Sequence, residues 1–152
     1  MPGIHGFDEV VDLSDFEDGS IRVGGNVKMV WQDVQSTDRI DISVELMKFQ
    51  RGTWQPTLYS MRLPDFCSRQ FDVTSIWYKV WTSHIDENDR KCANIYGHVY
   101  HHSPFNVNTI FDFPSNIEGR QKIVVKIEVF AAMNIKRQTY CYEIRGEFVK
   151  VK

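Results

Sequence analysis

Cysteine is scarce in this sequence, which contains only Cys67, Cys92 and Cys141 among its 152 residues. An odd count allows at most one internal disulfide and leaves one thiol over. None of the three belongs to a Cys-x-x-Cys pair, which excludes a zinc ribbon. Asn-x-Ser/Thr sequons are absent too, so glycosylation sites give no support to a secreted protein.

Charge of one sign is not concentrated anywhere along the chain. The formal net charge is -2, and the lysines and arginines are scattered. Nucleic-acid binders normally carry a basic stripe that meets the phosphates, and proteins held on a membrane by charge need a comparable basic cluster. We therefore expect neither a nucleic-acid partner nor attachment to an anionic membrane surface by charge alone.

Long apolar runs are missing as well. No stretch approaches the roughly 18 apolar residues that span a bilayer, so we expect no transmembrane segment. Residues 1–10 contain neither a basic region nor an apolar region and do not resemble a signal peptide, so the protein is either cytosolic or given without its leader. The length predicts a single domain over 1–152, in which residues 1–19 form a partly disordered N-terminal segment.

Sequence signatures of catalysis are absent. There is no Gly-x-Ser-x-Gly nucleophile elbow and no glycine-rich phosphate loop, and Gly24-Gly25 is expected to form a turn between two short β segments. Acidic pairs such as Asp86 and Glu87 lie in polar turns, whereas a catalytic carboxylate usually needs partial burial to shift its pKa. We expect a binding protein without enzymatic activity and without a cofactor.

Three of the five histidines cluster at His98, His101 and His102. On a strand, His98 and His102 would point the same way, but they would lie roughly 13 Å apart at about 3.3 Å per residue. That separation is too large for the two side chains to share one metal ion. We therefore interpret these residues as exposed strand histidines and expect no metal site.

Apolar residues with a period of two dominate what the sequence does contain. Hydrophobic residues make up 42% of the chain, enough for a sizeable core. The alternation is clearest where Ile40, Ile42, Val44 and Leu46 share one face, opposite polar residues. Strands joined mostly by short turns are predicted over 26–34, 40–47, 57–63, 95–101, 123–130 and 138–151, with a turn link at 134–137.

One segment, residues 72–84, has helical periodicity instead. Its apolar residues recur at helical spacing, at Val73, Ile76, Trp77, Val80 and Trp81. Asp72 is the predicted N-cap, and so apolar a helix must lie against a sheet. The predicted fold is therefore mainly β: an antiparallel β-sandwich or cup of two sheets, with about six to nine strands and one amphipathic helix.

Short motifs in a fixed order carry a resemblance to a known family. They are Asp65-Phe66-Cys67, Cys92, Phe113-Pro114 with Glu118-Gly119, and Cys141-Tyr142-Glu143-Ile144-Arg145-Gly146-Glu147. In their order and spacing, residues 20–152 resemble an insect family of secreted domains of unknown function that includes the chemosensory proteins B. That family is similar in turn to the ganglioside-activator and ML lipid-recognition domains.

The resemblance implies a β-sandwich cup whose apolar interior holds a lipid-like molecule. It implies a secreted protein with a role in contact chemosensation, including pheromone perception, and with a membrane receptor as a further partner. We also expect a disulfide between Cys67 and Cys92 that clamps the helix to the sheet and leaves Cys141 free. The chain departs from the family in showing no leader and no cysteine within residues 1–66, so we interpret it as a secreted protein given without its leader.

The ligand is expected between the sheets, near the end that the helix covers. Residues on the inner strand faces, the helical stripe and one extended segment should line the site: Met29, Trp31, Ile42, Val44, Leu46, Trp77, Trp81, Phe111, Phe113, Val125 and Ile127. The alternative is that these residues fill the core completely, which would make the domain a protein-interaction sandwich without a ligand. A ligand cup should enclose roughly several hundred Å³ of apolar space.

Overall fold

The computed structural model describes residues 7–15, 20–31, 33–108 and 117–149, which form two antiparallel β-sheets. The first sheet has the strand order β1-β2-β5 and the second has the order β4-β3-β6-β7. The strands are β1 (Phe7–Asp15), β2 (Ser20–Met29), β3 (Arg39–Gln50), β4 (Thr53–Leu63), β5 (Val99–Asn108), β6 (Gly119–Ala131) and β7 (Ile135–Phe148). The mainly β, two-sheet fold predicted from the sequence is confirmed.

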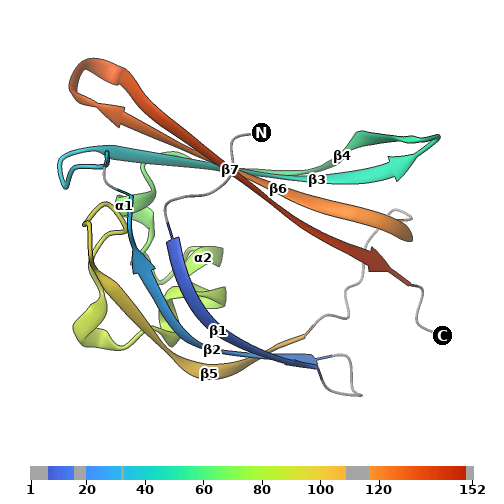
Figure 1. The fold of residues 1–152 in the computed structure, drawn as a ribbon, viewed down its shortest axis with the longest axis horizontal. Helices are drawn as coiled ribbons and strands as arrows, with labels where there is room; N and C mark the ends of the chain where they lie inside the picture. Colours follow the sequence, from blue (N-terminus) through green and yellow to red (C-terminus); the bar gives the residue numbers. More distant parts are fainter. Residues whose placement is uncertain (1–6, 16–19, 32, 109–116, 150–152) are drawn as a thin grey trace.

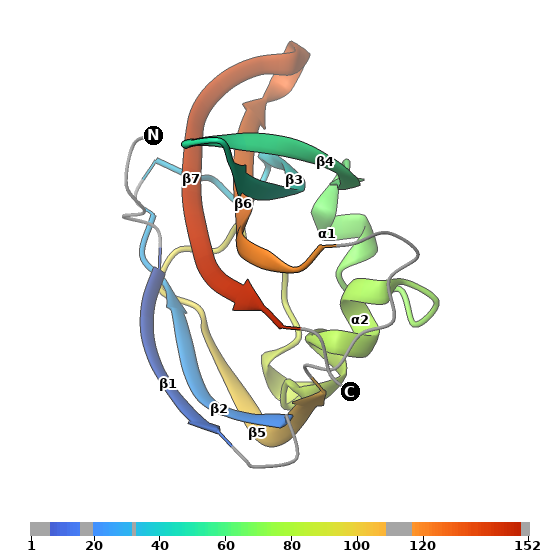
Figure 2. The same cartoon turned by 90° about the vertical axis from the view of Figure 1, so that its right-hand side faces the viewer.

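The two sheets face each other, and a helical segment closes one side of the space between them (Figures 1 and 2). This segment connects β4 to β5. It contains α1 (Phe66–Arg69), α2 (Ile76–Val80) and the short 3-10 helices η1 (Thr82–His84) and η2 (Glu87–Asp89). The apolar core lies between the sheets and the inner side of this segment.

Alternating residues of β3 and β6 form one wall of the core. Ile42 pairs with Ile127 and Ile40 pairs with Val129 across the two strands. All four side chains are buried, as the period of two predicts for a strand with one apolar face. The inward faces predicted for residues 40–47 and 123–130 are therefore confirmed.

Two strand boundaries near the helical segment differ from the prediction. The strand expected over 26–34 ends at Met29, and the strand expected over 95–101 begins only at Val99. Backbone hydrogen bonds at Met29 account for both boundaries. The Met29 N–H donates to the His98 carbonyl (2.9 Å), and the Met29 carbonyl accepts from the Gly97 N–H (2.7 Å). Gly97 has a φ of 79°, so the chain turns out of the β2–β5 ladder there.

The turn expected at Gly24-Gly25 was wrong, because both glycines lie inside β2. The pairing of β2 with β5 shifts register between Val23 and Gly25, as in a β-bulge. A Cβ atom on Gly24 would lie 3.3 Å from the side chain of Pro104 in β5. The Gly24-Gly25 pair therefore marks a close approach of two strands rather than a turn.

The other predicted strands begin earlier than expected, and β7 also ends earlier, at Phe148. β1 occupies residues 7–15 and pairs with β2 in the part of the chain expected to be partly disordered. β4 already begins at Thr53, and β7 begins at Ile135, inside the link expected at 134–137. The β6–β7 turn is tighter than predicted because Met133 and Asn134 both adopt positive φ.

The single helix predicted over 72–84 was wrong. Only α2 is α-helical in this stretch, and its N-cap is Ser75, whose hydroxyl accepts from the Tyr78 N–H at 3.0 Å. Asp72 instead accepts from Thr74 in a preceding turn (2.9 Å from the backbone N). Val73 was expected on the buried face, but it is 64% exposed. A five-residue helix has no independent stability, so packing against the sheets decides its limits.

A disulfide joins Cys67, in α1, to Cys92, which lies between η2 and β5. The two Cα atoms are 5.2 Å apart and the bond closes a sequence separation of 25 residues. Cys141 of β7 is a buried free thiol. The predicted pairing is confirmed, and the bond fastens both ends of the helical segment to each other. Among the described residues, no helix has the length and apolar character needed to cross a membrane.

Candidate ligand-binding cavity

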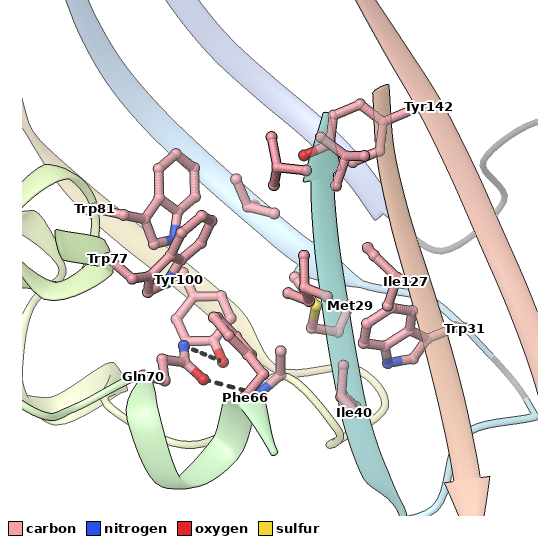
Figure 3. A pocket seen from close by; sticks show the side chains of 15 residues that line it. Met29, Trp31, Ile40, Phe66, Gln70, Trp77, Trp81, Tyr100, Ile127 and Tyr142 are labelled. Atoms are coloured by element: carbon pink, nitrogen blue, oxygen red, sulfur yellow. Dashed lines mark hydrogen bonds between the residues drawn. The ribbon is translucent and has the colours of Figure 1, made fainter. Parts of the chain in front are cut away.

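A cavity of about 160 Å³ lies in the core between the two sheets and the helical segment (Figure 3). Its wall combines residues of β2, β3, β5, β6 and β7, and Trp31 just after β2, with residues of the segment that connects β4 to β5. The described residues that line it are Val27, Met29, Trp31, Ile40, Ile42, Val44, Phe66, Gln70, Trp77, Trp81, Ala93, Tyr100, Val125, Ile127 and Tyr142. None of these side chains carries a charge, so the cavity is an apolar site.

Most of the residues expected to contact a ligand do meet in this cavity. They are Met29, Trp31, Ile42, Val44, Trp77, Trp81, Val125 and Ile127. Leu46 does not line the cavity, although it is buried on the predicted face of β3. It lies two residues beyond Val44, or roughly 7 Å further along the strand, and so beyond the end of the cavity. Phe111 and Phe113 lie outside the described residues.

Seven further residues line the cavity although they were not predicted from the sequence. They are Val27, Ile40, Phe66, Gln70, Ala93, Tyr100 and Tyr142. The alternation pattern could have supplied Val27 and Ile40, because they share a strand face with Met29 and Ile42. Phe66, Gln70 and Ala93 belong to the irregular helical segment, where sequence periodicity gives no indication of which side chains turn inward.

The cavity is smaller than the several hundred Å³ expected for a lipid cup. The large aromatic side chains explain the difference, because Trp77 and Trp81 lie on the cavity wall in addition to Trp31. Native cores contain few voids larger than a water molecule, so about 160 Å³ still exceeds an ordinary packing defect. A dry engineered cavity of about 150 Å³ accommodates benzene. The space therefore fits one ring, or a chain of about six to eight carbons.

Aromatic rings form a continuous group on the side of the cavity next to the helical segment. Phe66 and Trp77 meet edge to face, with ring centroids 5.1 Å apart. Trp77 and Trp81 follow at 5.9 Å, and Trp81 packs against His102 of β5 at 4.2 Å. The tilted and edge-to-face contacts are the favourable geometries for aromatic pairs. They hold the two tryptophans in place on a helix too short to hold them alone.

A buried hydrogen-bonded chain lies on the same side of the cavity (Figure 3). The Gln70 Nε2 donates to the Tyr100 hydroxyl (3.3 Å), and the Gln70 Oε1 accepts from the Ala93 N–H (3.3 Å). The Tyr100 hydroxyl donates in turn to the Lys91 carbonyl at 2.5 Å. Burial raises the pKa of Tyr100 to about 12, so the phenol keeps its proton at physiological pH. These hydrogen bonds connect the backbone on either side of Cys92 to the end of α1 and to β5.

The histidine cluster differs from the exposed strand histidines that were expected. His102 is buried behind Trp81, whereas His101 is exposed and its Nδ1 lies 2.6 Å from the Asp89 carboxylate. His98 contacts the Asp89 carbonyl through its Nε2 at 2.5 Å. Within the described part of the chain, no group of three His, Cys, Asp or Glu side chains could hold a metal ion.

No family model matches the chain, and no curated protein matches it.

Proposed function

We propose that this protein binds a small hydrophobic molecule in the cavity between its sheets. The supporting observation is an uncharged cavity of about 160 Å³ at the centre of the core. Ligand sites are typically concave and mostly apolar, with a few polar groups that orient the ligand. Gln70 and Tyr100 are such groups here, because both lie on the wall and are held in place by hydrogen bonds.

The wall composition supports binding rather than catalysis. The described lining residues include no Ser, Cys, His, Asp, Glu or Lys that could act as a nucleophile or general base. Burial raises the pKa of the Tyr100 phenol on the wall to about 12, so that this group keeps its proton at physiological pH. A ligand in this cavity would therefore be held chemically unchanged.

Secretion is part of the proposal, and the Cys67–Cys92 disulfide supports it. Structural disulfides form and persist mainly in oxidising compartments such as the extracellular space. A role in contact chemosensation, with a membrane receptor as a further partner, rests on the sequence resemblance to the insect family. The cavity favours a compact ligand over a long-chain lipid, which would need a larger space or an end left outside the cavity.

A ligand panel of graded size tests the proposal. The protein, refolded from denaturant so that co-purified molecules are removed, would be titrated with benzene derivatives, with chains of six to eight carbons and with an 18-carbon lipid. The two compact classes should raise the free energy of unfolding, by about 2.7 kcal/mol at a ligand concentration of 100 times Kd. If no member of the panel stabilises the protein, the protein-interaction sandwich becomes the better description.

A further inference from the structure

Residues 66–84, which contain α1, α2 and η1, form a lid over one side of the cavity (Figure 3). Phe66, Gln70, Trp77 and Trp81 come from this lid and line the cavity wall. Displacement of the lid would remove these side chains from a bound molecule and would open the cavity to water. The position of the lid therefore decides whether a ligand is held, an inference that rests on the proposed function.

The lid has little stability of its own. Its helices are four, five and three residues long, whereas isolated helices shorter than roughly 12–15 residues are marginal in water. None of residues 66–84 belongs to a strand, so no sheet ladder holds them. Segments of this kind open locally at a lower cost in free energy than the strands of a core. Contacts outside the helices must therefore keep the lid closed.

Polar contacts between the lid and its surroundings are few. Gln70 makes the two hydrogen bonds already described, with Tyr100 and with the Ala93 N–H. The Arg90 guanidinium reaches the Tyr78 hydroxyl only at 3.4 Å. Groups that leave such bonds can bond to water instead, so each bond makes a modest net contribution to closure. The aromatic contacts of the two tryptophans and one covalent bond supply the rest.

That covalent bond is the disulfide between Cys67 of the lid and Cys92 outside it. Cys67 directly follows Phe66, and Cys92 directly precedes Ala93, so each cysteine is next to a residue of the cavity wall. Asn94 fixes the chain on the far side of the bond, because its amide donates to a carbonyl of the link between β2 and β3 at 2.8 Å. The disulfide thus fastens the start of the lid to an anchored part of the wall.

We propose that this disulfide is a redox latch: its reduction lets the lid open and releases the ligand while both sheets stay folded. In the oxidised protein, an open lid remains constrained by a closed loop with a sequence separation of 25 residues. In the reduced protein the open lid has many more conformations, so opening becomes more favourable. The apparent Kd rises in inverse proportion to the fraction of molecules whose lid is closed.

A dithiol is the reductant that this latch requires. Cys67 and Cys92 are both only half-buried, so a small thiol can reach the bond. A thiolate of the dithiol attacks one sulfur and displaces the other cysteine, which takes up a proton. The second thiol of the reductant then displaces the first cysteine, leaving two cysteine thiols and an oxidised dithiol. Since the extracellular space is oxidising, the ligand would be held there and released where dithiols are present.

Ligand binding in the two redox states tests the release. Toluene and 1-heptanol would be titrated into the Cys141→Ala variant, oxidised and after treatment with dithiothreitol. The substitution removes the buried third thiol, which lies outside the cavity wall, so that only the Cys67–Cys92 pair responds. Reduction should weaken the binding of both probes about tenfold, which corresponds to a lid that is closed in about a tenth of the molecules.

Hydrogen exchange followed by NMR reports on the lid without a ligand. The Trp81 N–H donates to the Trp77 carbonyl (3.0 Å) inside the lid, and the Ala93 N–H donates to Gln70 across its edge. Reduction should speed the exchange of both amides about tenfold, as the open fraction grows. The exchange of the Ile127 amide in the central strand β6 should not change.

Leu46→Ala is the control for a general loss of stability. Leu46 is buried in β3 outside the cavity, so its truncation weakens the core without touching the lid. The oxidised variant should keep the wild-type Kd for both probes and the wild-type exchange at Trp81. If Leu46→Ala weakens binding as much as reduction does, the effect of reduction is general destabilisation and the latch is wrong.

The failure of the latch is distinguishable from the failure of the proposed function. If neither probe binds the oxidised protein, the proposed function fails and the release of a ligand fails with it. If both probes bind with the same Kd in both redox states, the latch is wrong while the binding function stands. Faster exchange at Ile127 together with Trp81 after reduction would also overturn the latch, because the disulfide would then hold the whole fold.

Discussion

The imidazole of His102 packs against the indole of Trp81, with the ring centroids 4.2 Å apart. His102 belongs to β5, and Trp81 is the C-cap residue that follows α2, so this contact joins the three-stranded sheet to the helical segment. His102 is buried, and its Nε2 has no hydrogen-bond partner among the described residues. Because Trp81 lines the cavity, the protonation state of His102 bears directly on the cavity wall.

We expect the protein to lose stability between pH 7.5 and pH 5. Burial lowers the pKa of His102 and also that of His84, and the two rings repel each other when charged. The unfolded chain takes up these protons near the ordinary pKa of 6.5, whereas the folded protein resists them. Stability is therefore fully present at about pH 7.5 and falls as the pH drops through 6.5 towards the lower pKa of the folded state. Urea unfolding at half-unit pH intervals would measure the decrease.

His102→Gln provides the control for this pH dependence, because it removes the titrating group behind Trp81. The variant should show a smaller loss of stability over the same range. Carboxylates contribute to the pH dependence of stability only at lower pH. Glu128 is an example, because a hydrogen bond and the charge of Lys136 hold its pKa below the usual 4.5. An unfolding free energy of the wild type that stays constant from pH 7.5 to pH 5 would contradict the prediction.

Val44→Trp should fill the cavity without unfolding the protein. Val44 lines the cavity, so a larger ring can occupy space that the core leaves open. Binding of the chains of six to eight carbons should be lost, while the free energy of unfolding should change by less than about 1 kcal/mol. Leu46→Trp is the matched control, because Leu46 is buried on the same strand face outside the cavity. Overpacking there should cost about 1–3 kcal/mol. Equal destabilisation by both substitutions would indicate a filled core.

Tyr100→Phe should lower the free energy of unfolding by about 1–3 kcal/mol, measured by urea denaturation. The substitution leaves the buried Gln70 amide and the Lys91 carbonyl without their shared partner. Tyr96→Phe removes the same hydroxyl from a side chain that is 57% exposed, and it should change stability by less than about 0.5 kcal/mol. Similar effects of the two substitutions would show that the hydrogen-bonded chain contributes no stability.

Unlike Tyr100→Phe, the substitution Thr82→Val should not lower the free energy of unfolding. Thr82 is completely buried, and its hydroxyl has no hydrogen-bond partner among the described residues. Valine has the same shape without the polar atom, so the substitution should be neutral or should stabilise the protein by up to about 1 kcal/mol. A loss of stability in the thermal melt would reveal a partner for this hydroxyl.

Replacing both Cys67 and Cys92 with serine should cost about 3 kcal/mol of stability, because the disulfide closes a sequence separation of 25 residues in the unfolded chain. Thiol titration of the denatured, non-reduced wild type should find one free thiol, that of Cys141. Three free thiols would contradict the disulfide. Cys141→Ala is the control and should leave the thiol count of the other two cysteines unchanged.

Strand alternation allowed much of the core wall to be predicted from the sequence. Ile42 and Val44 of β3 and Val125 and Ile127 of β6 line the cavity as expected. This succeeds because a strand directs alternate side chains to opposite faces, whatever surrounds it. The same rule could not indicate where along the face the cavity ends, and Leu46 was therefore included wrongly.

The helical segment shows where sequence reasoning fails. The periodicity of residues 72–84 correctly put Trp77 and Trp81 on one inward side, but it also put the exposed Val73 there and predicted a continuous helix. Gln70 and Tyr100 meet across 30 residues of sequence, so no local pattern could place their hydrogen bond next to the cavity. The register shift at Gly24 likewise depends on how closely β5 approaches.

Local alternation was enough to predict the mainly β architecture, the inner faces of the central strands and the absence of charge on them. The volume of the cavity, the burial of His102 and the lack of a partner for the Trp77 Nε1 among the described residues could be learned only from the folded structure. Each of these depends on how closely two sheets and an irregular segment pack together. That packing is a sum of many long-range contacts, which no short stretch of sequence encodes.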